Sequence, residues 1–239
     1  MSVFSRLKAL FRKPVLPERT SIYHPDAEQF RVRHAAYLAQ KASAVVQEPK
    51  PLSEHYGNFH TFLYRPDFDW FLKTEVLPLG PRTRAAVECF DANHWQKKHP
   101  FNFPGPFYTG ESDTCGTGVC EAPDNVANDE YSCEFVFRQP QNYPQFLHVL
   151  DAAAVEVLES YSANGNEYWT YAACKEWWRS RGELVAALSH PDVQRANNGQ
   201  AQAYLAYLDG AAETDLRRYC YFLENGQYPA DKSTALPPL

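Results

Sequence analysis

The feature that most constrains the fold is a change in the spacing of apolar residues at Pro140. Before it, residues 131–138 (YSCEFVFR) alternate between two sets of side chains, which is the pattern of a strand with one buried face. After it, apolar residues recur every three or four positions, which predicts amphipathic helices. The chain therefore changes from strand-forming to helix-forming sequence at this proline.

Four helices are predicted after Pro140. Apolar stripes at helical spacing cover residues 143–161, 170–188, 191–209 and 214–225. Thr170 is a suitable N-cap, Pro191 suits a first helical turn, and Gly210 and Gly226 are suitable helix ends. Together with the strand, these helices predict an α+β fold: a small, mostly antiparallel sheet in the first 140 residues with a C-terminal helical layer packed against it.

The first half of the chain has weaker patterns. Residues 58–64 alternate and predict a strand, whereas residues 67–77 predict a short helix that ends before Pro78. The polar, proline-bearing stretch 47–57 is typical of a connection. A longer helix is expected over residues 26–46.

The length of 239 residues suits one large domain or two small ones. We expect a basic N-terminal arm over residues 1–25, a single α+β domain over 26–226 and an extended tail over 227–239. Within the arm, residues 2–13 place Val, Phe and Leu opposite Arg and Lys. That pattern fits either weak association with a membrane surface or a terminal helix that packs on its own domain.

Charge and composition exclude several classes of protein. The formal net charge of -6 argues against a nucleic-acid binder, which would carry a basic patch. No stretch approaches the roughly 20 apolar residues that span a bilayer, and the N-terminus does not resemble a secretory signal. Six cysteines are few for this length and suit reduced thiols, so we expect a cytoplasmic protein.

One predicted loop has a composition that suggests more than a structural role. Residues 103–120 (FPGPFYTGESDTCGTGVC) combine four glycines and two prolines with several polar side chains. An ordered loop of this kind on a rigid scaffold is where function tends to lie. The alternative is a surface connection whose glycines serve only positive φ angles.

Known catalytic signatures cannot be completed on this loop. Gly116 and Gly118 begin a dinucleotide-binding pattern, but Glu121 stands where the third glycine is needed. The chain holds no phosphate-binding loop, no G-x-S-x-G motif and no H-E-x-x-H motif. The sequence therefore implies no cofactor.

Two kinds of chemistry remain open for the cysteines and histidines. His94, His99, Cys115 and Cys120 form an H-x4-H-x15-C-x4-C pattern, and tetrahedral zinc accepts two imidazoles with two thiolates. Their spacing is not that of a C-x2-C knuckle, so separate, unliganded side chains are the alternative. Cys115 is also a candidate nucleophile, with His94, His99 or His148 as its base.

The acidic residues predict a different role. Seven lie between Gly110 and Glu134, without any Lys or Arg. Such a stretch complements a basic partner, and nearby aromatic side chains supply anchors. The candidate partner-binding residues are Tyr108, Glu111, Asp113, Asp124, Asp129 and Glu130. The alternative is an acidic loop that only faces water.

A resemblance points in the same direction. The segment 104–115 (PGPFYTGESDTC), followed by EFVFRQP at 134–140 and WWR at 177–179, resembles a group of uncharacterised bacterial proteins with a G-P-F-Y-x-G-E-x-D-x-C segment. The resemblance covers about residues 100–190 and implies no catalytic residue. Small acidic proteins of this class are often immunity partners in toxin systems. Together with the acidic stretch, this class association leads us to expect a non-enzymatic binding protein, an immunity protein that occludes a basic toxin through its acidic loop. A small enzyme or zinc-binding protein with its site at 105–120 is the alternative.

Overall fold

The computed structural model describes residues 51–77, 88–196, 199–231 and 233–239, which belong to one compact unit, Lys50–Leu239. The predicted N-terminal arm and the helix expected over 26–46 lie outside the described residues. None of the helices in the described ranges is long and apolar enough to cross a membrane.

Short helices and strands make up the first part of the unit. In chain order they are α3 (Leu52–Tyr56), α4 (Phe59–Leu63), α5 (Phe68–Phe71), the π-helical turn η1 (Leu72–Val76), the 3-10 turn η3 (Trp95–Lys97), β1 (Tyr108–Thr109), α7 (Gly118–Glu121), β2 (Val126–Asn128) and β3 (Glu134–Val136).

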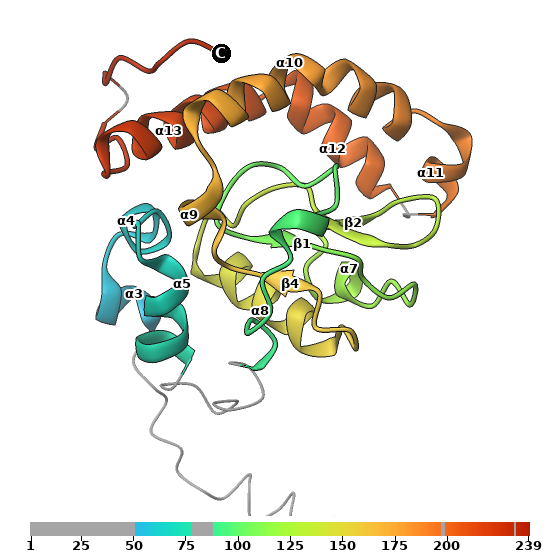
Figure 1. The fold of residues 1–239 in the computed structure, drawn as a ribbon, viewed down its shortest axis with the longest axis horizontal. Helices are drawn as coiled ribbons and strands as arrows, with labels where there is room; N and C mark the ends of the chain where they lie inside the picture. Colours follow the sequence, from blue (N-terminus) through green and yellow to red (C-terminus); the bar gives the residue numbers. More distant parts are fainter. Residues whose placement is uncertain (1–50, 78–87, 197–198, 232) are drawn as a thin grey trace, which may run out of the picture. The chain divides into compact units, whose positions relative to one another are not determined.

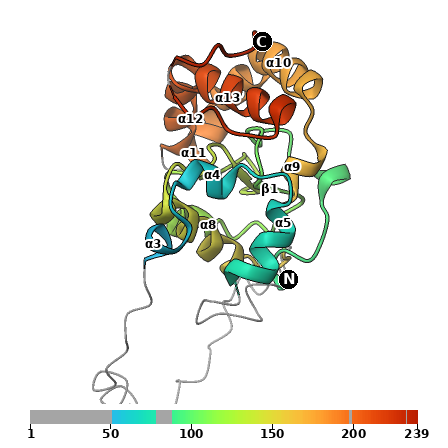
Figure 2. The ribbon, with the colours of Figure 1, turned by 90° about the vertical axis from the view of Figure 1, so that its left-hand side faces the viewer.

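Longer helices dominate the second part. They are α8 (Tyr143–Val155), α10 (Tyr171–Leu188), α11 (Pro191–Ala196), α12 (Gln200–Asp209) and α13 (Ala212–Asn225), with β4 (Tyr161–Ser162) and α9 (Gly165–Tyr168) between the first two. In Figures 1 and 2 the strands lie between α8 on one side and α10, α12 and α13 on the other.

The strands form two antiparallel pairs, β1 with β4 and β2 with β3. Buried Asn102 joins the two pairs, because its Oδ1 accepts the amides of Thr109 in β1 and Val136 in β3, at 3.1 and 2.8 Å. Its Nδ2 also donates to the Thr109 carbonyl at 2.8 Å. One side chain thus satisfies main-chain groups that these short strands leave unpaired.

The core is built mainly from aromatic rings that tie the layers together. Phe146 of α8 packs against Phe62 of α4, with ring centroids 5.1 Å apart, and against Phe107, 6.1 Å away. All three rings are almost fully buried. Since each such ring removes roughly 150–250 Å² from water, these contacts are a main source of stability.

The α+β class and the C-terminal helical layer are confirmed. Helix α10 begins where predicted, with Thr170 Oγ1 accepting the amide of Ala173 at 3.2 Å. Helix α13 ends at Gly226, whose φ of 70° is left-handed. Residues 67–77 are helical as predicted, in α5 and η1.

Two predictions in the first half were wrong. Residues 59–63 form helix α4 rather than a strand, because Asn58 Oδ1 accepts the amides of His60 and Thr61 at 3.0 and 3.1 Å and starts a helix. The stretch predicted as a connection contains helix α3. At α4 the local cap outweighed the alternating pattern, whereas α3 has no side-chain cap and no buried residue.

Boundaries also differ in the second half. Helix α8 ends at Val155, and Tyr161 lies in β4 instead, so strand structure extends beyond residue 140. The predicted helix 191–209 divides into α11 and α12, with Gly199 at a left-handed φ of 96°. Strand β3 covers only part of 131–138, because Ser132 adopts a φ of 67° in the preceding turn.

Candidate functional site

The acidic stretch turns three of its seven carboxylates inward. Asp113 Oδ1 accepts the Cys115 amide at 2.7 Å, and its Oδ2 accepts the Val157 amide at 3.3 Å. Asp129 Oδ1 accepts the amides of Tyr131 and Cys133 at 2.9 and 2.8 Å. Asp113 and Asp129 are therefore corrected from partner contacts to buried supports of the loop.

Glu134 is the third inward carboxylate. It accepts the Gly118 amide at 2.7 Å and the Tyr161 hydroxyl at 2.7 Å. Burial raises the pKa of its carboxyl, and the hydrogen bonds from Tyr161 and Gly118 only partly offset this. Its partners are thus main-chain and phenol donors rather than a cation.

Tyr108 is also corrected. Its ring is fully buried, and its hydroxyl donates to Asn164 Oδ1 at 2.7 Å. Strand β1 pairs with β4 and lies beside β3, and both of its residues are buried. Tyr108 is therefore not exposed to serve as an aromatic anchor for a partner.

The other predicted partner residues are exposed. Glu111, Asp124 and Glu130 all face solvent. Glu111 forms an ion pair with Lys97, 3.2 Å between Nζ and Oε2, in which both side chains are mostly exposed. An ion pair of this kind contributes little to stability, so Glu111 is available to a partner.

A buried carboxylate holds the loop of residues 156–160. Glu156 Oε1 accepts the Asp113 amide at 2.8 Å, and its Oε2 accepts the Ser160 amide at 2.7 Å. The Glu159 carbonyl accepts His94 Nε2–H at 2.9 Å, and Glu159 has a positive φ of 53°. The loop is tied at both ends and strained at one residue, which indicates a defined shape.

This loop presents two aliphatic side chains to water. Val157 is 71% exposed and Leu158 is 58% exposed. Nearby, Ser112 Oγ accepts the Glu134 amide at 2.6 Å and connects the 110–117 loop to the turn that carries Tyr131, itself 71% exposed. We call Glu111, Glu130, Tyr131, Val157 and Leu158 the loop edge. In Figure 1 these loops lie at the end of the unit away from α3–α5.

The predicted zinc ligands do not form a metal site. Within the described ranges, no group of three or more His, Cys, Asp or Glu side chains is arranged to hold a metal ion. His99 has both ring nitrogens occupied, because Nδ1 accepts the Phe101 amide at 3.1 Å and Nε2–H donates to Asp129 at 3.2 Å. His94 likewise supports the backbone, through the Glu159 carbonyl.

The cysteines do not have the environment of a nucleophile. Cys115 is exposed, and the neighbouring Asp113 carboxylate raises the pKa of its thiol. A raised pKa disfavours the reactive thiolate. Cys120 is exposed on α7, and His148, another candidate base, is exposed on α8.

The loop glycines serve close packing more than positive φ. Of those in 103–120, Gly116 alone has a positive φ, at 64°. A Cβ at Gly118 would overlap the Glu134 carboxylate, and one at Gly110 would lie 2.7 Å from the His94 Cβ. The alternative in which these glycines serve only positive φ angles is therefore wrong.

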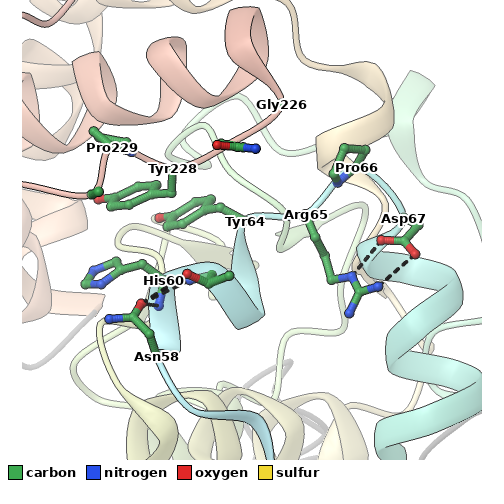
Figure 3. Close-up of a pocket in the computed structure, with 12 residues that line it drawn as sticks. Asn58, His60, Tyr64, Arg65, Pro66, Asp67, Gly226, Tyr228 and Pro229 are labelled. Atoms are coloured by element: carbon green, nitrogen blue, oxygen red, sulfur yellow. Dashed lines mark hydrogen bonds and ion pairs between the residues drawn. The ribbon is translucent and has the colours of Figure 1, made fainter. Parts of the chain in front are cut away.

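The structure also contains a cleft that the sequence patterns did not indicate. It has a volume of about 740 Å³ and lies between α4 and the segment that follows α13 (Figure 3). The residues that line it are Asn58, His60, Thr61, Tyr64, Arg65, Pro66, Asp67 and Gly226, Gln227, Tyr228, Pro229, Ala230. Two segments far apart in the chain form its walls, so no local motif identifies it.

Comparisons with protein-family models, with curated proteins and with solved structures found no match to this chain.

Proposed function

We propose that this protein is a non-enzymatic binding protein that docks a basic protein partner on its loop edge, as an immunity protein does when it occludes a toxin. The observation that carries the proposal is the 156–160 loop, in which a buried carboxylate holds Val157 and Leu158 out in water. Buried polar groups that order an exposed apolar pair fit a preorganised binding surface.

The composition of the loop edge suits a protein partner. Each aliphatic side chain that enters an apolar pocket contributes about 1.5–3 kcal/mol. Tyr131 supplies a large ring of the kind enriched at interface hot spots. The exposed carboxylates of Glu111 and Glu130 attract a basic surface and orient it.

The same geometry weakens the enzymatic alternative. Asp113 and His99, an acid and an imidazole that a reaction on the 105–120 loop could use, already accept or donate hydrogen bonds within the scaffold. Cys115 has a neighbouring carboxylate rather than an imidazole to set its pKa.

The test uses the product of the adjacent gene as the partner. We expect this product to be toxic to cells when it is expressed alone. Co-expression of this chain should rescue the cells, and calorimetry should show that the two proteins bind. Leu158→Asp places a charge in the apolar contact and should weaken binding at least about tenfold and abolish rescue. Val185→Asp, at an exposed position on α10, is the matched control and should retain both.

Each result is decisive. If the wild-type chain neither binds nor rescues, the proposed function is wrong. If it binds but Leu158→Asp and Val185→Asp behave alike, the loop edge is the wrong surface.

A further inference from the structure

The cleft between α4 and the segment after α13 has a wall of aromatic rings. Tyr228 stacks on Tyr64 at 4.5 Å and 9°, and on His60 at 4.7 Å and 10°. His60 and Tyr64 are one helical turn apart, and their rings are also nearly parallel, at 6.2 Å and 8°. Figure 3 shows these rings on one side of the cleft, away from Arg65. Parallel rings of this kind are a stacking surface for planar groups.

The charges in and beside the cleft are compensated. Arg65 donates from Nε and Nη2 to the two carboxylate oxygens of Asp67, at 2.6 and 2.9 Å. Arg218, which is hydrogen-bonded to Tyr228, pairs with Asp215 at 3.4 Å. Burial lowers the pKa of His60, so its ring is neutral at pH 7. Nothing in this arrangement favours an anion over a neutral molecule.

The cleft is also lined by residues whose main-chain amides have no hydrogen-bond acceptor within the described part of the protein. Among the described residues, no acceptor is hydrogen-bonded to the amides of Gln227, Tyr228 or Ala230. These residues line the cleft, and free main-chain amides beside a cleft can bind the acceptors of a ligand and fix its orientation. The volume of about 740 Å³ lies in the range of small-molecule sites.

We propose that this cleft binds a small, neutral molecule with a planar heteroaromatic ring, which stacks on the Tyr228 wall and accepts hydrogen bonds from the 227–230 backbone. The site is separate from the loop edge and does not depend on the proposed protein partner.

The test measures binding of adenosine and of N-acetyl-tryptophanamide to the full chain by NMR titration. We expect saturable binding of at least one, and weaker binding of AMP than of adenosine, because the cleft has no uncompensated cation for the phosphate. Tyr228→Ala should weaken binding about tenfold through the lost stacking, whereas Tyr228→Phe keeps the ring and retains affinity within about threefold.

Tyr131→Ala removes an exposed tyrosine of the loop edge and should leave this binding unchanged. Circular dichroism of each variant establishes that the fold is retained. The inference is overturned if neither neutral probe saturates, if AMP binds more tightly than adenosine, or if folded Tyr228→Ala binds as well as or better than the wild type.

Discussion

Close contacts at individual glycines leave no room for a larger residue in and beside the 103–120 loop. Gly118 packs directly against the Glu134 carboxylate and the Tyr161 hydroxyl, and Gly165 packs against the main-chain carbonyl of Gly105. No side chain fits at these contacts. By contrast, nothing lies within 4 Å of a Cβ placed on Gly182, in the middle of α10. Glycine is therefore required by packing at position 118, whereas a side chain has free space at position 182.

We predict that Gly118→Ala destabilises the protein by about 1–3 kcal/mol, since the added methyl displaces the buried Glu134 carboxylate from its donors. Gly182→Ala is the matched control and should stabilise by about 0.5–1 kcal/mol, because alanine suits an exposed helix interior better than glycine. Urea denaturation of both variants measures the difference. Equal effects at the two sites would contradict the packing argument.

At the scale of elements, buried side chains replace long ladders of main-chain hydrogen bonds. Strands β1 and β4 have two residues each, and the segments around them are connected through Asn102, Asp113, Glu134 and Glu156. Such networks define a shape only when every member has its partners. The loops therefore depend on these side chains more than on strand pairing.

We predict that Glu156→Ala costs about 2 kcal/mol or more of unfolding free energy, because it leaves the buried amides of Asp113 and Ser160 without an acceptor. The exposed Glu121→Ala serves as control and should change stability by less than about 0.5 kcal/mol. Hydrogen exchange should show faster exchange at residue 160 in the first variant. Unchanged protection at that amide would contradict the role given to Glu156.

For the whole molecule, acid stability depends on carboxylates that are charged and hydrogen-bonded. Burial by itself raises the pKa of Asp129, but hydrogen bonds from His99, Cys133 and Tyr131 outweigh it, so the folded-state pKa lies below its ordinary value. The charged form therefore stabilises the native state above the unfolded-state pKa of about 3.9. That stabilisation is lost as the pH falls through the folded-state pKa.

We predict that the wild type loses stability more steeply than Asp129→Asn between about pH 4 and pH 2, since only the carboxylate can be protonated. Thermal unfolding across this range measures the two slopes. Glu111→Gln, at an exposed position, should follow the wild-type slope. Parallel curves for the wild type and Asp129→Asn would show that this group does not contribute.

The sequence by itself determined the elements whose signals are local. The helical stripes and the cap at Thr170 predicted α10 and α13, because apolar periodicity and end residues act within a few turns. The same patterns predicted the α+β class. Where two local signals competed, as in the alternating 58–64, the N-cap Asn58 decided for a helix.

Only the tertiary structure decided which way the loop residues face. Asp113, Glu111 and Glu130 are acidic residues of the same stretch, yet only Asp113 meets an amide of a distant segment, that of Val157, and turns inward. The cleft depends on His60 and Tyr228, which lie far apart in the chain and meet only after α13 packs. The direction of a side chain depends on the partners that surround it, and long-range packing supplies those partners.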